Sequence, residues 1–237
     1  NAIEKMGIDV FRVTGKGYRL AEPLLLLNKS AIAEHCQRQA LNPNIETHSV
    51  IDSTNTFLLR RIPNQVQKGQ ICVAEFQSAG RGRRGRTWVS PFGSHIYFSM
   101  YWYFEQGMAA AMGLNVVVAL AISDALSNLY QLEAQLKWPN DIYLNDKKLA
   151  GILIELEGQA LEPCHSVIGI GLNVNMPSQM AEKIDQPWSD IQTNVENKVD
   201  RNQLVGELIR CLHKRLNTHE ESGINAMVDD WHARDKF

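Results

Sequence analysis

The chain has 237 residues, a length that allows one large domain or one domain with a small appendage. Apolar residues make up 44% and charged residues 21%, which excludes a disordered, collagen-like or wholly coiled-coil chain. The chain has 26 acidic and 24 basic residues, for a net charge of -2, so any affinity for nucleic acid or membrane must come from a local cluster of charge.

The cysteines and the apolar segments indicate a cytoplasmic protein. Four cysteines lie far apart without a CxxC spacing, which fits neither a zinc site nor a disulfide scaffold, so we expect reduced thiols. We expect no secretory signal at the start of the chain. The most apolar stretch, 107–123, contains Asn115 and is at the short limit for a membrane span. It predicts a buried helix and no membrane contact.

The first 20 residues predict a small appendage. Residues 1–6 are typical of the last turn of a helix, which Gly7 would end. Apolar and polar residues then alternate over 8–20 around a Gly-Lys-Gly turn at 15–17, which predicts a β-hairpin with a basic tip. A hairpin this small is marginal by itself, so we expect it to depend on the main domain or on residues upstream of the chain.

Helical and strand patterns alternate along the rest of the chain and predict an α/β or α+β domain on one sheet. Ser53 is placed to cap a short helix, and Asp200 with Gln203 resembles a capping box before a long one. Residues 176–200 are polar and contain two prolines, which predicts a surface excursion. The other expected elements are helices over 30–41 and 108–130 and strands over 50–52, 71–76, 95–103, 134–138, 149–155 and 166–171.

Residues 80–86, Gly-Arg-Gly-Arg-Arg-Gly-Arg, form an arginine-glycine loop that favours an anion site. Mutual repulsion of the cations and the backbone entropy of the glycines oppose folding, so a plain solvated loop tip is the weaker interpretation. Guanidinium groups bind phosphate or carboxylate through paired hydrogen bonds. We expect the loop to be mobile when empty and ordered by an anion. A patch for nucleic-acid phosphates is the competing interpretation.

The same loop also matches the dinucleotide-binding pattern G-x-G-x-x-G after a strand. That pattern requires a helix that begins at the loop. Here Pro91 and Gly93 break any helix, and residues 95–103 predict a strand. We therefore reject dinucleotide binding.

Two further segments bear groups suited to a ligand. Ser53-Thr54-Asn55 offers hydroxyl and amide groups at a strand-to-helix junction, as a plain cap or as part of a pocket that Gln77 would share. Residues 137–141, Lys-Trp-Pro-Asn-Asp, form either an ordinary turn or a site in which Asn140 and Asp141 help to hold Mg²⁺.

Three more positions leave a structural and a functional interpretation open. Lys148 precedes an apolar run, so its ammonium group either reaches solvent or lies on an anion. Glycines alternate with isoleucines over 168–171, which often marks close approach of a ligand or another backbone. Trp88 either fills the core or stacks on an aromatic ligand. The seven histidines show no metal-ligand spacing.

Taken in order, these motifs resemble the biotin protein ligase family, in particular its bifunctional bacterial type that also represses the biotin operon. The resemblance covers nearly the whole chain and rests on residues 51–55, 77–86, 88–93, 137–141, 148–153 and 169–173. It implies a mixed β-sheet with helices, in the biotin/lipoate ligase-like catalytic fold.

The resemblance implies a reaction in two steps. Biotin and ATP, with Mg²⁺, would give biotinyl-5′-AMP and pyrophosphate. The biotinyl group would then pass to a lysine of the biotin carboxyl carrier protein of acetyl-CoA carboxylase. Two alternatives remain: a DNA-binding repressor that senses a ligand without ligase activity, and a lipoate or octanoate ligase, whose motifs differ from the arginine-glycine loop.

The resemblance also implies roles for individual residues. Arg83 and Lys148 would be catalytic, and Asp141 would hold the metal ion. Biotin would lie against Ser53, Thr54, Asn55, Gln77, Arg81, Gly82, Arg83 and Lys148. The nucleotide would lie against Arg84, Arg86, Trp88, Asn140 and Asn173.

Finally, the resemblance implies a domain organisation. Residues 1–22 would be the tail and wing of an N-terminal winged helix-turn-helix domain, and residues 23–237 the catalytic domain. The recognition helix and a small C-terminal β-barrel would lie outside this chain. Operator DNA is therefore expected as a partner of the full-length protein only, and a homodimer is expected on adenylate binding.

Overall fold

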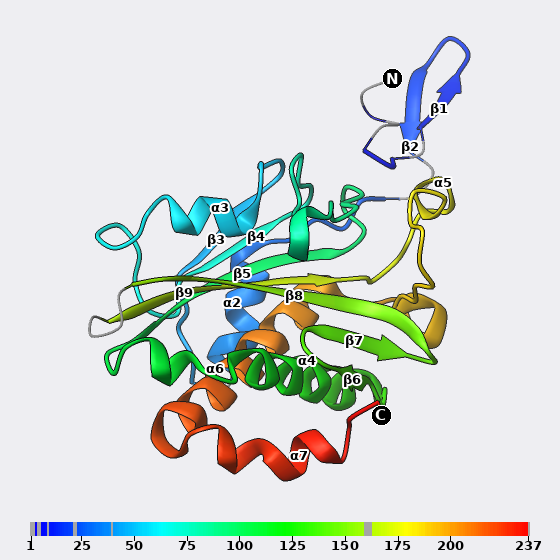
Figure 1. Cartoon of the computed structure of the whole chain (residues 1–237). Coiled ribbons are helices and arrows are strands. Elements are labelled where there is room, and N and C mark those ends of the chain that lie inside the picture. Colours follow the sequence, from blue (N-terminus) through cyan, green and yellow to red (C-terminus); the bar gives the residue numbers. More distant parts are fainter. Residues whose placement is uncertain are drawn as a thin grey trace.

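The computed structural model describes all residues except 1, 2, 4, 5, 9, 21, 22, 39, 159–162 and 237. Its larger sheet has the strands β3 (Ile45–His48), β4 (Ile71–Ala74), β5 (Ile96–Phe104), β6 (Gln135–Lys137), β7 (Asp141–Leu144), β8 (Lys147–Glu157) and β9 (Cys164–Leu172). Their order across the sheet is β3-β4-β5-β9-β8-β7-β6 (Figure 1). Only β3 and β4 pair in parallel, so the predicted mixed sheet is confirmed.

Helices cover the two faces of this sheet unequally. The helices are α2 (Lys29–Gln37), α3 (Thr54–Leu59), α4 (Leu114–Tyr130), α5 (Ser178–Ala181), α6 (Arg201–Ser222) and α7 (Val228–His232), with the short 3₁₀ segments η1 (Arg83–Gly85), η2 (Met108–Ala111), η3 (Gln192–Asn194) and η4 (Ile224–Met227). Helices α2, α4 and α6 lie on one face, and α3 lies on the other (Figure 1). Asp200 caps α6 as predicted, because its carboxylate accepts the N–H groups of Asn202 and Gln203.

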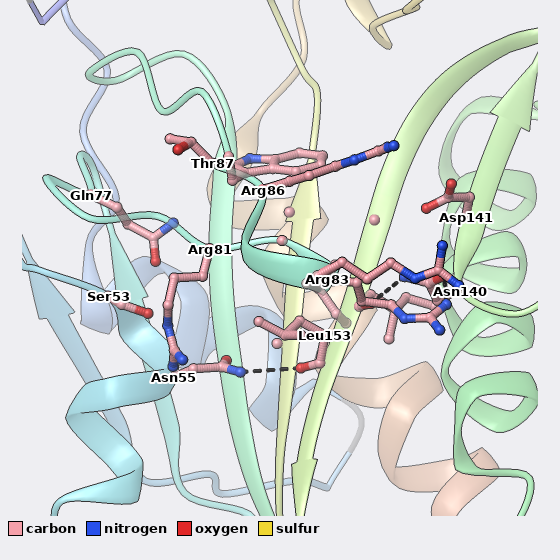
Figure 2. Close-up of a pocket in the computed structure, with 18 of the residues that line it drawn as sticks. Ser53, Asn55, Gln77, Arg81, Arg83, Arg86, Thr87, Asn140, Asp141 and Leu153 are labelled. Carbon is pink, nitrogen blue, oxygen red and sulfur yellow. Dashed lines mark hydrogen bonds between the residues drawn. The ribbon is translucent and has the colours of Figure 1, made fainter. Parts of the chain in front are cut away.

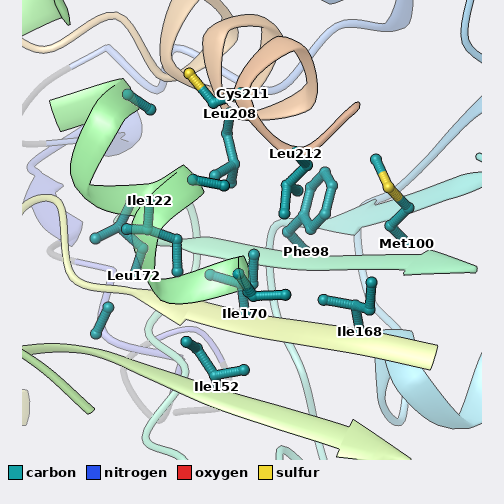
Figure 3. Packing of buried hydrophobic residues seen from close by; sticks show 14 of the residues in the cluster. Phe98, Met100, Ile122, Ile152, Ile168, Ile170, Leu172, Leu208, Cys211 and Leu212 are labelled. Atoms are coloured by element: carbon teal, nitrogen blue, oxygen red, sulfur yellow. The ribbon is translucent and has the colours of Figure 1, made fainter. Parts of the chain in front are cut away.

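The main core lies between the sheet and helices α4 and α6. On β9, Ile168, Ile170 and Leu172 are buried on this side, next to Ile122 of α4 and Leu208 of α6 (Figure 3). Each such side chain contributes about 1.5–3 kcal/mol through burial. Side chains alternate between the faces of a strand, so the intervening glycines of β9 face the opposite side of the sheet.

Helix α4 is the core helix that the apolar stretch predicts. Within the described residues, Met108–Tyr130 is one helical stretch long and apolar enough to cross a membrane, but it is mostly buried inside the fold. The predicted start at residue 108 is wrong. Gly113 has φ of 79°, and a Cβ there would meet Ile224, so the chain turns at this glycine and the α-helix begins after it.

The structure moves one predicted strand and adds one that was not predicted. The strand predicted over 50–52 lies earlier, as β3, and only Ile51 pairs further on, in a single bridge to Gln77. Strand β7 was not predicted. It forms a hairpin with β8 through Asn145 and Asp146, which have φ of 51° and 61°. Asn and Asp tolerate this left-handed conformation better than most residues, so the turn closes without glycine.

The predicted surface excursion over 176–200 is partly buried. Lys148 donates its backbone N–H to Pro187 and accepts the N–H of Ser189 at 3.0 and 2.9 Å. Asp190 and Ile191 are buried next to this contact. The polar composition of the segment wrongly predicted full exposure to solvent, because the Asp190 carboxylate accepts backbone N–H groups of the same segment instead of facing water.

The predicted N-terminal hairpin is present. Strands β1 (Val10–Val13) and β2 (Gly17–Leu20) form a separate two-stranded sheet that projects from the main body near α5 (Figure 1). Its attachment includes the N–H of Phe92, which donates to the carbonyl of Met6 at 2.8 Å. The helical turn predicted over 1–6 falls mostly outside the described residues.

The last residues of the chain cover one edge of the sheet. Leu136 of β6 donates its N–H to Arg234 at 2.8 Å and accepts the N–H of Lys236 at 3.0 Å. Asp235 thereby pairs with Leu136 in a parallel bridge. The tail at 234–236 therefore continues the sheet beyond β6.

An ionic network joins α4, α6 and this tail. The Asp124 carboxylate of α4 lies 2.7 Å from both Arg215 of α6 and Arg234. Arg215 also pairs with Asp230 of α7. Burial acts to raise the pKa of Asp124, but the hydrogen bonds from the two arginines outweigh it and hold that pKa below its ordinary value.

We expect Asp124→Asn to lower the free energy of unfolding by about 2–3 kcal/mol at pH 7, because it leaves two partly buried arginines without their shared carboxylate. A carboxyl with a lowered pKa stabilises the fold above its unfolded pKa, and this stabilisation is lost as the pH falls through the folded pKa. Urea denaturation at several pH values should therefore show the difference between the two proteins shrinking below about pH 4.

The matched control is Asp146→Asn, which breaks an ion pair with Lys236 whose carboxylate is exposed to solvent. Exposed pairs contribute little, so its denaturation midpoint should stay close to that of the wild type. Equal losses in both variants would contradict the role given to Asp124.

Candidate active site

A cavity of about 310 Å³ lies on the face of the sheet that bears α3. Its floor comes from β8 and β9, and its walls come from the start of α3, the arginine-glycine loop and the turn between β6 and β7. The structure gathers all but one of the predicted site residues here. Those that line the cavity are Ser53, Thr54, Asn55, Gln77, Arg81, Gly82, Arg83, Arg84, Arg86, Trp88, Asn140, Asp141 and Lys148.

Glycines on the floor leave room for side chains that pack flat on the strands. A Cβ on Gly169 would lie 2.2 Å from Oδ1 of Asn55, and one on Gly171 would lie 2.4 Å from Cε2 of Trp88. A Cβ on Gly151 of β8 would lie 3.0 Å from the same indole. The groups that approach these glycines closely are therefore the side chains of Asn55 and Trp88, and not another backbone as one predicted interpretation has it.

The Ser53-Thr54-Asn55 segment both caps a helix and lines the cavity, so its two interpretations hold together. The Ser53 hydroxyl accepts the N–H of Thr56 at 3.5 Å and begins α3. The N–H of Thr54 donates to Oε1 of Gln77 at 3.0 Å. Gln77, which follows β4, therefore joins the pocket as expected.

Asn55 is the centre of a buried hydrogen-bond network. Its Nδ2 donates to Glu155 at 2.8 Å. It also donates to the carbonyl of Leu153 at 3.1 Å (Figure 2). Its Oδ1 lies 2.5 Å from the hydroxyl of Ser99, which also lies 2.7 Å from the hydroxyl of Thr54. Sequence reasoning missed Ser99 and Glu155. Glu155 lies on the strand that carries Gly151, and Ser99 lies on β5 opposite Gly169, a pairing between distant segments that the sequence pattern does not reveal.

The arginine-glycine loop is a tight hairpin in this structure. The N–H of Gly82 donates to Arg86 at 2.7 Å, and the tip turns through Arg84 and Gly85, with φ of 55° and 73°. The loop thus places four guanidinium groups around one cavity. Arg83 donates from Nη1 to Oδ1 of Asn140 (Figure 2).

Asn140 is itself fixed to the sheet. Its Nδ2 donates to the carbonyl of Ile152 at 2.9 Å, and its own carbonyl accepts the N–H of Ile152 at 2.9 Å. The amide oxygen is therefore held in place for Arg83. The turn at 137–141 thus contributes to the cavity.

Lys148 turns its ammonium group into the site. Nζ lies 2.8 Å from the Asp141 carboxylate and 5.9 Å from the ring centre of Trp88, and the side chain is only 14% exposed. Among the described residues, Asp141 is the single carboxylate that lines the cavity. No group of three His, Cys, Asp or Glu side chains in the described part of the chain is arranged to hold a metal ion.

Asn173 is the predicted site residue that does not line the cavity. It is buried, its Nδ2 donates to the carbonyl of Ser189 at 3.0 Å, and its N–H donates to Leu149. It therefore ties the segment around Ser189 to the strand that carries Lys148. That segment also brings Gln186 to the cavity, which sequence reasoning missed because its polar pattern resembles a solvated loop.

The cavity is suited to binding anions and holds no activated thiol. The four cysteines are free and buried. Burial raises the pKa of Cys36 to about 11 and that of Cys211 to about 12, and it also raises the pKa values of Cys72 and Cys164. None is a nucleophile at neutral pH.

The two ends of the cavity differ in character. Polar groups for a neutral ligand lie at the end around Ser53, Asn55 and Gln77, whereas Arg83, Asn140 and Asp141 lie at the other end (Figure 2).

Comparison with known proteins gives consistent results. A family model described as the biotin/lipoate A/B protein ligase family matches residues 48–173. The bifunctional ligase/repressor BirA of Salmonella typhimurium is 44% identical over 98% of this chain and 70% of its own length. The protein of the same name from Bacillus subtilis is 27% identical over 98% of this chain and 71% of its own length.

Solved structures show the same fold. The biotin protein ligase of Aquifex aeolicus in complex with biotin and ATP has a TM-score of 0.67 and 25% identity, over 82% of this chain and 79% of that one. The biotin protein ligase of Leishmania major in complex with biotinyl-5-AMP has a TM-score of 0.68 and 23% identity, over 83% of each chain.

We expect Gly171→Ala to destabilise the fold by about 1–3 kcal/mol, since the new methyl group must displace the Trp88 indole from the floor. Urea denaturation measures this loss, and near-ultraviolet circular dichroism should report the displaced indole.

Gly82→Ala provides the matched control. Gly82 has φ of -111°, and a Cβ there would find its nearest neighbour at 3.5 Å, so alanine fits without strain. The interpretation of the floor would be refuted if Gly171→Ala were as stable as this control.

Proposed function

Because the chain belongs to the biotin/lipoate A/B protein ligase family, we propose that its cavity is the active site of an ATP-dependent biotin protein ligase. A carboxylate oxygen of biotin attacks the α-phosphorus of ATP, and pyrophosphate leaves as biotinyl-5′-AMP forms. The amine of a carrier lysine then attacks the acyl carbon, and AMP leaves. The bound molecules of the solved relatives, namely biotin with ATP and biotinyl-5-AMP, support both the substrates and the intermediate.

The observation that carries this proposal is the convergence of five cations on one cavity: Arg81, Arg83, Arg84, Arg86 and Lys148. The reaction must bring a carboxylate against a triphosphate. Two like unit charges 4 Å apart repel by about 4 kcal/mol at an effective dielectric constant of 20, and a triphosphate multiplies this repulsion. Fixed cations remove that barrier and stabilise the charge that develops on the departing pyrophosphate.

Arg83 and Lys148 are the proposed catalytic residues. Asn140 holds the Arg83 guanidinium over the cavity, so the group is already oriented before substrate enters. Lys148 is held between Asp141 and the Trp88 ring and exchanges its carboxylate partner for phosphate oxygens when ATP binds. No covalent intermediate with the enzyme is required, which agrees with the absence of an activated thiol among the cysteines.

Magnesium fits this donor set only as a companion of the nucleotide. The ion often binds through one or two carboxylates together with substrate phosphates. Asp141 is the carboxylate that would hold it here, once Lys148 moves to the phosphates. Bound there, the ion supplies positive charge to the phosphate oxygens.

The remaining predicted residues divide between the two substrates. The biotin ring binds against Ser53, Thr54 and Gln77, and the nucleotide base stacks on the indole of Trp88. The arginine-glycine loop covers the reacting groups and keeps water from the mixed anhydride. Asn173 supports this site from outside the cavity, through its bonds to the Ser189 segment and to β8.

We further propose the partners and the domain organisation. The acceptor is the biotin carboxyl carrier protein, since a relative from Paracoccus denitrificans, 40% identical over 77% of each chain, is named biotin–[acetyl-CoA-carboxylase] ligase. Residues 1–22 are the tail and wing of a DNA-binding domain, and residues 23–237 are the catalytic domain. Operator binding by the full-length protein and a homodimer stabilised by the adenylate complete this proposal.

We expect the chain to form biotinyl-5′-AMP when it is incubated with Mg-ATP and biotin, and to form no lipoyl-adenylate with lipoate in a parallel reaction. Arg83→Ala should lower the rate of adenylate formation by about 100-fold or more, the size of effect seen when one donor to a developing charge is removed. Mass spectrometry of the quenched reaction measures both.

The control is Arg38→Ala, which removes the exposed C-cap arginine of α2 that pairs with Glu34 away from the cavity. It should react at the wild-type rate. Circular dichroism should show that Arg83→Ala remains folded, because this exposed side chain contributes little to packing. A folded Arg83→Ala protein with unchanged rate would disprove the role of Arg83, and lipoate turnover would favour the alternative ligase.

A further inference from the structure

Two residues outside the cavity lining, the buried Ser99 and the half-buried Glu155, determine which way the protons point at its ring-binding end. We propose that Ser99 and Glu155 are positioning residues that fix the Thr54 hydroxyl as a hydrogen-bond acceptor, so that the site selects a ligand ring that presents an N–H group there. This inference rests on the proposed function, because it concerns how the same site chooses biotin.

The direction of the network is set first at Asn55. The two groups near its Nδ2 are the carbonyl of Leu153 and the carboxylate of Glu155, and both can only accept. The amide nitrogen must therefore occupy this position. The opposite atom, Oδ1, can only accept, and it faces Ser99.

The proton of Ser99 is then committed. Its Oγ lies 2.5 Å from Oδ1 of Asn55, so the single hydroxyl proton is donated there. The Thr54 hydroxyl lies 2.7 Å from the same Oγ, and at that distance one of the two oxygens must donate. Since Ser99 has no second proton, Thr54 is the donor.

Thr54 therefore has only lone pairs left for the cavity that it lines. The other candidate for its proton, Oε1 of Gln77, lies further away at 3.2 Å and already accepts the Thr54 N–H. Ser99 is fully buried, and Thr54 and Asn55 are nearly so. Burial limits the access of water to these groups, and a buried unmatched group is costly.

Glu155 anchors the network to the arginine-glycine loop. Its Oε2 accepts from Nδ2 of Asn55 and from Nη2 of Arg81, each at 2.8 Å. Without this carboxylate, the Asn55 amide loses its charged hydrogen-bond acceptor, the interaction that most strongly holds Nδ2 on that side. Arg81 also donates to the hydroxyl of Thr56, so the same guanidinium joins the loop to α3 beside the ring-binding end.

An acceptor at Thr54 matches the cyclic urea of biotin, whose ring nitrogens donate. It does not match the dithiolane ring of lipoate, which has no N–H group. A buried site built for a hydrogen bond rejects an analogue that lacks it far more strongly than an apolar pocket rejects a difference of shape. Discrimination between biotin and lipoate thus follows from the direction in which the Thr54 hydroxyl donates its proton.

The test uses biotin and its two cyclic carbamate analogues, each with one ring N–H replaced by oxygen, and measures kcat/KM for adenylate formation by the whole chain. We expect the wild type to reject at least one analogue by about 100-fold or more. Ser99→Ala frees the Thr54 hydroxyl to turn and donate to the ring oxygen. Discrimination should then fall at least tenfold and KM for biotin should rise, whereas KM for ATP should stay unchanged.

Glu155 gives an independent pair of variants. Glu155→Ala should lose discrimination in the same way, and Glu155→Gln should retain most of it because its amide oxygen still accepts from Asn55. The matched control is Ser166→Ala. Ser166 is another fully buried serine of the sheet, and it donates to the carbonyl of Trp102 at 3.0 Å, outside this network. This variant should discriminate as the wild type does.

The outcomes separate the two proposals. A wild type that makes no biotinyl-5′-AMP overturns the proposed function and this inference with it. A wild type that makes it but accepts both carbamates as readily as biotin overturns the inference alone. So does unchanged discrimination in Ser99→Ala and Glu155→Ala, or an equal loss in Ser166→Ala. If Ser99→Ala fails to fold, the partly exposed Glu155 variants decide the question.

Discussion

The structure depends on one constraint: strands β8 and β9 must satisfy opposite requirements on their two faces. Toward the helices they supply isoleucine and leucine, which fill the core under α4 and α6. Toward the cavity they supply glycine, because Asn55 and Trp88 lie where any Cβ would be. Strand periodicity allows both in consecutive residues, as in the run Ile168-Gly-Ile-Gly-Leu172. The burial that stabilises the sheet therefore also fixes the floor of the site.

Charge imposes the second requirement, because the cations that line the cavity repel one another when no anion is bound. The fold answers with internal partners. Glu155 accepts from Arg81, Asp141 accepts from Lys148, and the amide oxygen of Asn140 accepts from Arg83. Each partner is fixed on β8 or on the β6–β7 hairpin, so the cations are already oriented by the sheet. Preorganisation of this kind is what makes fixed dipoles and charges effective in stabilising a transition state.

Much of this arrangement follows from local sequence, and the rest follows from register. The arginine-glycine loop and the Lys-Trp-Pro-Asn-Asp segment are informative by themselves because such residues have no simple packing role. Ser99 and Glu155 carry no such signal. Their position depends on the pairing of Ser99 with Gly169 and of Glu155 with Val167, contacts between distant segments that periodicity does not reveal. The start predicted too early for α4 and the missed β7 have local causes, a left-handed glycine and an Asn-Asp turn.

The short tail at 234–236 has a consequence for solubility. An outer strand with unpaired N–H and carbonyl groups is a template for edge-to-edge association between molecules. Here Leu136 directs its backbone groups to Arg234 and Lys236, so three residues at the end of the domain occupy that template. Their loss would expose the backbone groups of β6, the strand that leads into the turn at the cavity wall. The tail thus occupies an edge at which molecules could otherwise pair, a role distinct from any part in the chemistry.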